Sequence, residues 1–404
     1  MNNYTKFDPN IPPPPLMTGE PDSFAHKTMI TRIPAVIDNV LADYANQYSP
    51  EIKQGLQRLR SEVMADKPVQ LLPLTTFDAN QWTDAWAAYP QATWLNCPWY
   101  LAEAYFYRRL LAAVNYFGPG AWAGVDPYHF RKSAELKADN PWQLLTSALK
   151  HSDHNSSDSL GRLLHYGVWG NRLDLSYAKV AEGAAGGIAL EQEQANLLVD
   201  DTATVLGHLE STAGYQIEFI CDNAGDELLM DLALADFLLR FKWAGQVTLH
   251  VKAYPTFVSD ATTADVRQTI AACQAQAAVE LQQFAARLAE QQNNGRLRIE
   301  SDPFWNSHHF FWELPPHLQT KLGHAQLVII KGDANYRRLL GDSRWPAVVP
   351  LVAAVPYFPA PFVALRTMKS DPVVGLQPGQ AEALNQTDPE WRVNGQRGLI
   401  QAVV

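Results

Sequence analysis

Apolar positions change their spacing about halfway along the chain. Before residue 195 they recur at intervals of three and four, as at Ile33, Val36 and Ile37, which is the period of an amphipathic helix. After residue 195, short apolar runs rich in Ile, Val and Phe alternate with helical segments. Strands that alternate with helices are typical of a mostly parallel sheet. The pattern therefore predicts the α/β fold class, with a mainly helical N-terminal region (1–194) packed on a Rossmann-like, doubly wound α/β/α sandwich domain (195–404).

The first clear helix prediction covers residues 23–46, where Asp22 or Ser23 is placed to cap the start. Residues 99–117 have the same helical pattern, and the segments FRKSAELKADN and ALEQEQANLLVDD indicate further helices. In the second half, the Ala- and Gln-rich residues 265–292 predict one long helix. The expected strands are YQIEFI, QVTLHVKAY, RLRIESD, AQLVIIKGD, APFVALRTMKS and RGLIQAVV.

The stretch EFICDNAGDELLMDL connects one of these strands to a helix, and it places Asp222, Asn223 and Gly225 at the junction. In open α/β sheets, ligands bind at the carboxyl ends of the strands, so these residues are candidates for a functional site. The same residues are also common in turns and helix caps, with Asp222 or Asp226 as the cap. Taken alone, the stretch favours the cap.

Polar groups also follow the other predicted strands. Asp260 follows one strand, the run KGDANYRR places Lys331 and Asp333 after another, and RTMKSD places Lys369 after a third. A parallel sheet brings these strand ends to one rim. Two carboxylates and an amide oxygen are hard ligands that suit Mg²⁺ or Mn²⁺, and lysines neutralise phosphate, which together indicate metal-assisted phosphoryl hydrolysis. Each position also has a structural alternative, a cap at Asp260 or a tight turn after Lys331.

Composition narrows the class of partner. The net charge is -10 and the pI is about 5.6, which argues against a nucleic-acid-binding surface. Three widely spaced cysteines, Cys97, Cys221 and Cys273, argue against a disulfide framework and predict a cytoplasmic protein. No signal peptide and no apolar run of about 18 residues is found, so no membrane association is expected. The sequence also contains no nucleotide P-loop, G-x-S-x-G or H-E-x-x-H motif.

Four blocks, DNAGDELLMDL, HVKAYPTFVSD, KGDANYRRLLGD and LRTMKSD, occur in this order along the chain. They resemble the signature blocks of the metal-dependent damage-control phosphatase family, whose eukaryotic branch is named acidic-residue methyltransferase-like. The Arg-Thr-x-Lys block, Arg366 to Lys369, is similar to the mark of the subfamily that acts on sugar phosphates. The helical segments SFAHKTMITRIPAVI, WYLAEAYFYRRLL and YGVWGNRLDLS also resemble that subfamily, so the resemblance covers nearly the whole chain.

This resemblance implies a role for individual positions. Asp222, Asn223 and Asp260 match the ligands of a divalent metal, which is Mn, Co, Ni or Mg in such a family. Asp333 is a candidate acid/base or sugar-hydroxyl acceptor, and Lys369 matches the phosphate-contacting lysine. The implied substrate-binding residues are Glu103, Arg108, Asn171, Asp174, Glu227, Lys331, Gly332, Asp333, Asn335, Arg366 and Lys369.

The expected function is hydrolysis of small phosphomonoesters, with fructose 1-phosphate and fructose 6-phosphate as candidate substrates in metabolite damage control. The family name keeps a second possibility open, an S-adenosylmethionine-dependent protein carboxyl methyltransferase, although no glycine loop of that kind is present. A third is a non-catalytic sugar-phosphate-binding protein. The sequence does not decide whether water or a carboxylate such as Asp222 is the nucleophile, and it does not give the oligomeric state.

Overall fold

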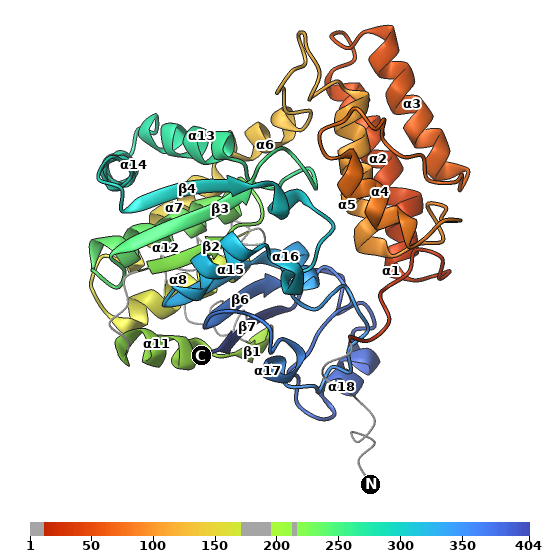
Figure 1. Cartoon of the computed structure of the whole chain (residues 1–404). Coiled ribbons are helices and arrows are strands. Elements are labelled where there is room, and N and C mark those ends of the chain that lie inside the picture. Colours follow the sequence, from red (N-terminus) through yellow and green to blue (C-terminus); the bar gives the residue numbers. More distant parts are fainter. Residues whose placement is uncertain (1–11, 171–194, 212–215) are drawn as a thin grey trace.

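The computed structural model describes residues 12–170, 195–211 and 216–404. In these ranges the C-terminal half forms a sheet of seven strands in the order β1-β7-β6-β5-β2-β3-β4 (Figure 1). The strands are β1 (Leu197–Asp200), β2 (Gln216–Ile220), β3 (Gln246–Lys252), β4 (Leu297–Asp302), β5 (Leu327–Lys331), β6 (Phe362–Thr367) and β7 (Gly398–Val403).

The sheet is mostly parallel and doubly wound, as predicted. Strand β2 pairs in parallel with β3 on one side and with β5 on the other. The chain runs outward from β2 through β3 to β4, and then returns to the other side of β2 to form β5 and β6. Strand β7 runs antiparallel to β6. The order therefore reverses between β2 and β5, and this switch point is where open α/β sheets bind ligands.

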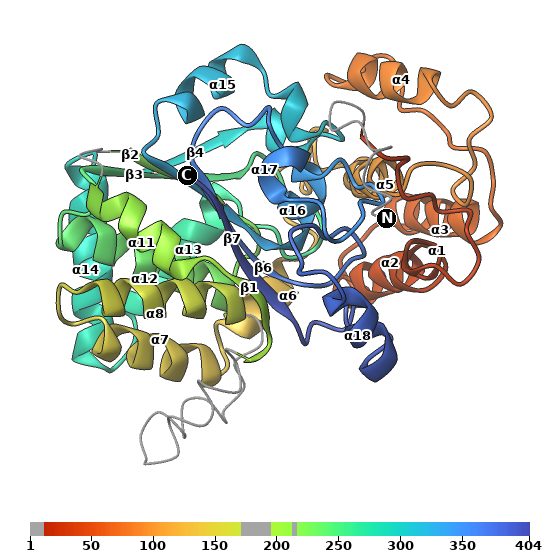
Figure 2. The ribbon, with the colours of Figure 1, turned by 90° about the horizontal axis from the view of Figure 1, so that it is seen from below.

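Helices cover both faces of the sheet (Figure 2). Alternate residues of each strand face opposite sides, so Ile217 and Phe219 belong to one apolar cluster and Ile220 to another. The first face carries α7 (Asn140–His151), α8 (Ser157–Trp169), α11 (Thr202–Ser211), α12 (Asp226–Arg240), α13 (Thr263–Gln274) and α14 (Val279–Asn293); the second carries the 3₁₀ turns Pro303–Asn306 and Phe311–Glu313, α15 (Pro316–Gly323), α16 (Gly332–Leu339), α17 (Leu351–Ala354) and α18 (Gln380–Thr387).

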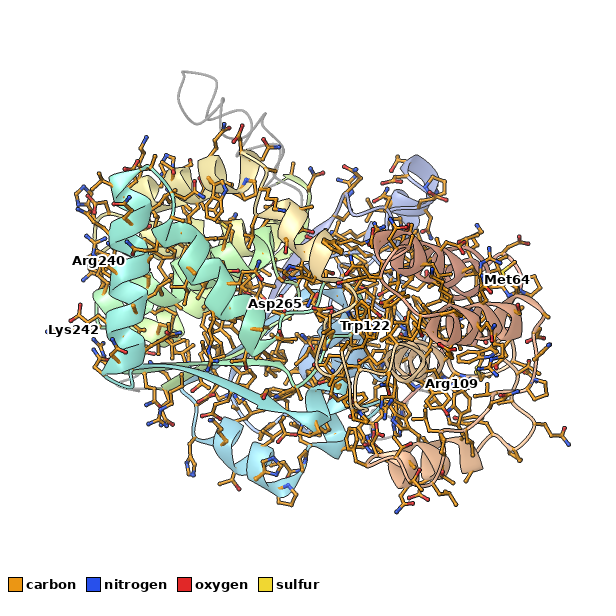
Figure 3. All side chains as sticks on the ribbon, turned by 90° about the horizontal axis from the view of Figure 1, so that it is seen from above. Met64, Arg109, Trp122, Arg240, Lys242 and Asp265 are labelled. Atoms are coloured by element: carbon orange, nitrogen blue, oxygen red, sulfur yellow. The ribbon has the colours of Figure 1, made fainter. Side chains whose placement is uncertain are left out.

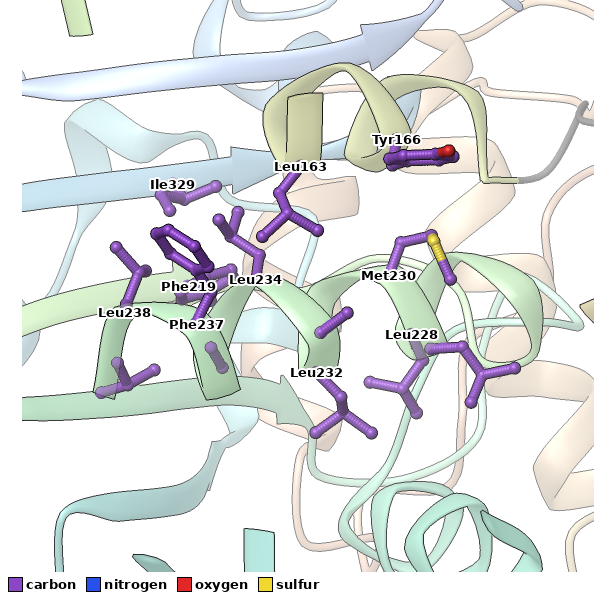
Figure 4. Packing of buried hydrophobic residues seen from close by; sticks show 14 of the residues in the cluster. Leu163, Tyr166, Phe219, Leu228, Met230, Leu232, Leu234, Phe237, Leu238 and Ile329 are labelled. Atoms are coloured by element: carbon purple, nitrogen blue, oxygen red, sulfur yellow. The ribbon is translucent and has the colours of Figure 1, made fainter. Parts of the chain in front are cut away.

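Helix α12 is apolar on nearly every side because it is enclosed between other elements. Figure 4 shows Leu234 and Phe237 of α12 near Phe219 of β2, and Leu163 of α8 next to Leu234. A helix that is hydrophobic all round belongs in a core. This burial fixes the position of the first turn of α12, which follows Asp222 and Asn223.

The first part of the chain forms a separate helical unit with its own apolar core. Ser23 caps its first helix by accepting a hydrogen bond from the His26 amide at 3.0 Å, which confirms one of the two predicted caps. In Figure 1 this unit stands beside the sheet. Its elements are α1 (Phe24–Lys27), a π-helical turn (Thr28–Arg32), α2 (Ile33–Asp43), α3 (Pro50–Met64), α4 (Ala79–Ala87) and α5 (Trp99–Ala113).

One element prediction is wrong, and a second is wrong in part. The expected long helix 265–292 is broken into α13 and α14, because the break lets Val266 and Phe284 on the two halves both reach the core beside the sheet. The end of the segment ALEQEQANLLVDD forms β1 rather than a helix, whereas Ala195 is helical and the residues before it lie outside the described ranges. Pairing with β7 outweighs the local helical pattern there.

The domain division at residue 194 stays a prediction. Helices α7 and α8 come before that point, yet their apolar residues join the core of the sheet. The short helix α6 (His129–Glu135) lies between the two parts of the molecule (Figure 1).

The cysteines and the helix lengths can be compared with the sequence analysis. Cys97, Cys221 and Cys273 are all buried and free. Within the described ranges, every helix is too short or too polar to cross a membrane.

Candidate active site

The turn after β2 supplies the first two candidate residues, Asp222 and Asn223. Gly225 occupies the N-cap position of α12 with φ +73°, and no side chain caps this helix. The alternative that Asp222 or Asp226 is a helix cap is therefore wrong. Glycine is needed at the turn because left-handed backbone is costly for residues with a Cβ. Asp222 is buried without a capping role, which leaves its carboxylate available for chemistry.

The loop after β3 folds back and places Asp260 beside this turn. Asn223 and Asp260 form a β-bridge, and the amide of Ala261 donates to the carbonyl of Asp222 at 2.7 Å. The cap of α13 is Thr262, not Asp260, so the structural alternative for Asp260 is also wrong. The hydroxyl of Ser259 donates to Asn223 Oδ1 at 2.5 Å. Two strand ends thus bring two carboxylates and an amide together.

Helix α6 holds this loop from the side of the helical unit. The Nζ atom of Lys132 donates to the Asp260 carbonyl at 2.8 Å and to the Asp265 carboxylate at 2.9 Å. Figure 3 shows Asp265 and Trp122 where the two parts of the molecule meet, with Arg240 at the far end of the sheet. The site therefore lies at the junction of the sheet and the helical unit.

Asp222 forms no ion pair with any described residue, whereas Asp260 is paired with Lys252. Asp222 Oδ2 accepts from Asn223 Nδ2 at 3.0 Å, while its Oδ1 has no hydrogen-bond partner among the described residues. Burial raises the pKa of Asp222 well above its usual range, and Asp260 and Glu227 raise it further. Burial also raises the pKa of Asp260, although Lys252 Nζ lies 3.3 Å from its Oδ2 atom. A cluster of buried acids with this imbalance favours a cation.

The residues present fit a divalent cation. Asp222 offers a buried oxygen that no other described residue contacts by a hydrogen bond, and Asn223 and Asp260 offer further oxygens. Hard oxygen donors of this kind suit Mg²⁺ or Mn²⁺. In the described part of the chain, no three His, Cys, Asp or Glu side chains gather as a metal-binding group, so the candidate set depends on the asparagine amide as its third member.

The turn after β5 packs directly against Asp222. Gly332 has φ +78°, and a Cβ there would lie 1.9 Å from Asp222 Oδ2. The next residue, Asp333, is held by Arg366 Nη2 at 2.7 Å and by the Lys369 amide at 3.0 Å. Burial acts to raise the pKa of Asp333, but Arg366 together with Ser370, Arg337 and the Lys369 amide outweighs burial, and the pKa is lowered. Asp333 is therefore an ionised hydrogen-bond acceptor at the cavity wall.

Lys331 lies beneath the cavity rather than in its lining. Its Nζ atom donates to the Gly167 carbonyl and lies 2.9 Å from Asp231 Oδ1 and 3.5 Å from Glu227 Oε1. Burial raises the pKa of Asp231 to about 7, and Lys331 opposes this rise. Asp231 was not predicted from the sequence, although it stands one helical turn after Glu227 on α12. In this arrangement Lys331 neutralises buried acids and orients Glu227.

Lys331→Met should lower the free energy of unfolding by about 3–5 kcal/mol, because it leaves the buried Asp231 without its counter-charge. Urea denaturation monitored by circular dichroism measures the change. The double variant Lys331→Met/Asp231→Leu removes both charges and should recover most of the lost stability. Unchanged stability in Lys331→Met would contradict the pairing.

The remaining predicted residues are divided between the cavity and its support. Glu103 lines the cavity and accepts from Arg337 Nη1 at 2.6 Å. Asn335 is buried outside the cavity lining, and its side chain donates to the Cys221 carbonyl at 3.1 Å. Arg108 is paired with Asp78 inside the helical unit and does not line the cavity. Asn171 and Asp174 lie outside the described residues.

The cavity at the switch point has a volume of about 120 Å³. Its wall includes residues that the sequence analysis did not assign, because they come from distant segments of the chain. One of these residues, Arg32, lies in a π-helical turn, a feature that is frequent at functional sites. The lining residues are Phe24, Arg32, Trp99, Glu103, Val168, Asp222, Asn223, Glu227, Phe257, Ser259, Asp260, Gly332, Asp333, Ala334, Arg337, Thr367 and Lys369.

A doubly wound sheet with an acidic cavity at its switch point is the arrangement in which open α/β proteins bind their ligands. Residues 28–384 match the model of the damage-control phosphatase ARMT1-like domain. The chain therefore belongs to the ARMT1-like damage-control phosphatase family, which confirms the resemblance seen in the sequence.

Relatives of similar length carry the same description. The chain is 31% identical to damage-control phosphatase ARMT1 of Danio rerio, with 97% of each chain covered. It is 30% identical to the Homo sapiens protein of that name, covering 94% of this chain and 96% of the relative. A DUF89 family protein from Pyrococcus horikoshii aligns with a TM-score of 0.49 at 12% identity, covering 93% of this chain and 96% of that one.

Proposed function

We propose that this protein is a cytoplasmic, metal-dependent phosphatase that hydrolyses small phosphomonoesters, in particular sugar phosphates such as fructose 1-phosphate or fructose 6-phosphate. The observation that carries the proposal is the buried Asp222 carboxylate, whose Oδ1 atom has no hydrogen-bond partner among the described residues and lies beside Asp260 and Asn223. When bound there, Mn²⁺, Co²⁺, Ni²⁺ or Mg²⁺ would act as a Lewis acid toward a phosphoryl oxygen.

The protein groups around the cavity have complementary roles in this proposal. Lys369 lines the cavity with an exposed side chain and binds the phosphoryl oxygens. Asp333 remains ionised beside Arg366 and accepts a hydrogen bond from a sugar hydroxyl. Glu227 faces the cavity and is oriented from below by Lys331. Either water or the Asp222 carboxylate is the attacking nucleophile, and both are consistent with this arrangement.

The test is release of inorganic phosphate from fructose 1-phosphate and fructose 6-phosphate with each of the four metals. S-adenosylmethionine binding is measured in parallel by calorimetry. The proposal expects metal-dependent phosphate release and no S-adenosylmethionine binding. Binding of S-adenosylmethionine with transfer of its methyl group to carboxylates, and no phosphate release, would instead support the methyltransferase. Binding of the sugar phosphates without turnover would support the non-catalytic alternative.

Arg108→Met should affect stability but not substrate binding. It leaves the buried Asp78 without its partner, so we expect a loss of about 3–5 kcal/mol in the free energy of unfolding. The KM for a sugar phosphate should change less than about twofold, because Arg108 does not line the cavity. Arg60→Met, which breaks a pair exposed to solvent, is the control and should leave stability unchanged. A large rise in KM for Arg108→Met would instead place this residue in the substrate pocket.

A further inference from the structure

A second and larger cleft adjoins the catalytic cavity, with a volume of about 710 Å³. We call it the distal cleft. It shares Phe24 and Arg32 with the catalytic cavity, so the two spaces meet at the start of the helical unit. Its other walls come from residues 343–345, 371–372 and 389–394. A substrate too large for the 120 Å³ cavity would extend into the distal cleft.

The π-helical turn determines which side chains face the distal cleft. The Ile33 amide donates to the Thr28 carbonyl, five residues earlier, which is the π-helical pattern. In a regular α-helix, residues three and four apart share a face and residues five apart do not. The wider turn brings Lys27 and Arg32 to the same side, and both line the cleft. The local backbone thus places two cations on one wall.

Cationic side chains outnumber acidic ones in the distal cleft, although the whole chain has a net charge of -10. Lys27 and Arg32 make no ion pair with any described residue, and Lys27 is exposed. Arg392 donates to the Asp371 carbonyl at 2.9 Å. Burial raises the pKa of the Asp371 carboxyl, while Arg392 opposes this rise. The unpaired cations are the groups ready to accept an anion.

Once the paired residues are set aside, Lys27 and Arg32 face two acids of the lining, Asp22 and Glu390. Arg344 is held by Glu20, outside the lining of the cleft. Asp22 and Glu390 also line the cleft, and they would repel an anion that approached them. The wall formed by Lys27 and Arg32 is therefore the binding surface for negative charge.

We propose that the distal cleft binds a second phosphate group on the far end of the substrate, whose reacting phosphomonoester occupies the catalytic cavity. The preferred substrate class is then a sugar bisphosphate rather than a monophosphate. This inference rests on the proposed phosphatase function. Lys27 and Arg32 bind the distal phosphate, and Arg32 connects the two spaces. Charge-assisted hydrogen bonds of this kind are strong enough to change binding about tenfold or more.

The kinetic test compares kcat/KM for fructose 1,6-bisphosphate and fructose 6-phosphate with Mn²⁺ present. The wild-type ratio of the two values should be about ten or more, and Lys27→Ala should reduce it about tenfold. The exposed Arg58 on α3 does not line either space, so Arg58→Ala is the matched control and keeps the wild-type ratio. A wild-type ratio near one, or a ratio that Lys27→Ala leaves unchanged, would overturn the inference.

A binding test separates this inference from the phosphatase proposal. Calorimetry in EDTA should show that fructose 1,6-bisphosphate binds the wild type about tenfold more tightly than Lys27→Ala, because the distal phosphate contacts protein cations. Equal affinities of the wild type and Lys27→Ala would overturn the inference. Tighter binding of glucosamine 6-phosphate than of fructose 1,6-bisphosphate would also overturn it, because the acids of the cleft would then prefer a cationic group. Absence of phosphate release from every substrate would refute the phosphatase function alone, since the EDTA measurement still decides the distal site.

Discussion

Asp222→Ala should reduce kcat for phosphomonoester hydrolysis by about a thousandfold or more while the protein stays folded. The substitution removes a candidate metal ligand, the buried carboxylate whose Oδ1 atom has no partner in the part of the chain that the structure describes. A bound metal contributes several kcal/mol of transition-state stabilisation, and each 1.4 kcal/mol is about tenfold in rate. Steady-state kinetics with Mn²⁺ measures the loss.

The stability of this variant separates a functional acid from a structural one. Burial and two neighbouring acids raise the pKa of Asp222, so its charge opposes folding in the absence of a cation. Urea denaturation in EDTA should therefore show that Asp222→Ala is at least as stable as the wild type. Asp226→Ala, in the next turn and outside the cavity lining, is the control and should keep kcat within about threefold. Full activity of Asp222→Ala, or an equal loss in both variants, would contradict the assignment.

Gly332→Ala should lower kcat by about a hundredfold. The added Cβ would lie 1.9 Å from Asp222 Oδ2, so the carboxylate must move. A displacement of about 1 Å at a reacting group costs about a hundredfold in rate. The φ of +78° at Gly332 adds backbone strain of about 1–2 kcal/mol for a residue with a Cβ. Kinetics and urea denaturation of the same preparation measure the two effects.

Gly379→Ala is the matched control for Gly332→Ala. Gly379 has φ +83°, and a Cβ there meets nothing within 4 Å. It should lose a similar amount of stability from backbone strain and keep wild-type kcat. If both variants lose activity equally, the contact between Gly332 and Asp222 does not control catalysis.

The sequence predicts the sheet well because its apolar runs are short and clearly bounded. The pattern of QIEFI, QVTLHVK and LVIIK identifies β2, β3 and β5, and their alternation with helices gives the parallel arrangement. Local pattern fails where tertiary packing decides. Residues 265–292 have continuous helical propensity, yet the chain breaks after α13 so that both halves bury apolar side chains.

The candidate site was only partly predictable for the same reason. Asp222, Asn223 and Asp260 follow strands that share one rim, and the structure brings Asn223 and Asp260 into a β-bridge. The ion pair between Glu103 and Arg337 joins residues 234 positions apart, so no local sequence pattern predicts this pair. The role of a charged residue also depends on its ion-pair partners, which the residue type alone does not give. A lysine after β5 suggested a phosphate contact, whereas burial against two acids places Lys331 beneath the cavity.

The central claim is that Asp222, Asn223 and Asp260 hold the divalent cation that phosphomonoester hydrolysis requires. The most direct measurement is an anomalous difference map from crystals of the wild-type protein grown with Mn²⁺. The account predicts one strong peak in the catalytic cavity beside these three side chains, and its loss in crystals of Asp222→Ala. A peak elsewhere, or no peak in a protein that hydrolyses sugar phosphates equally well in EDTA, would contradict it.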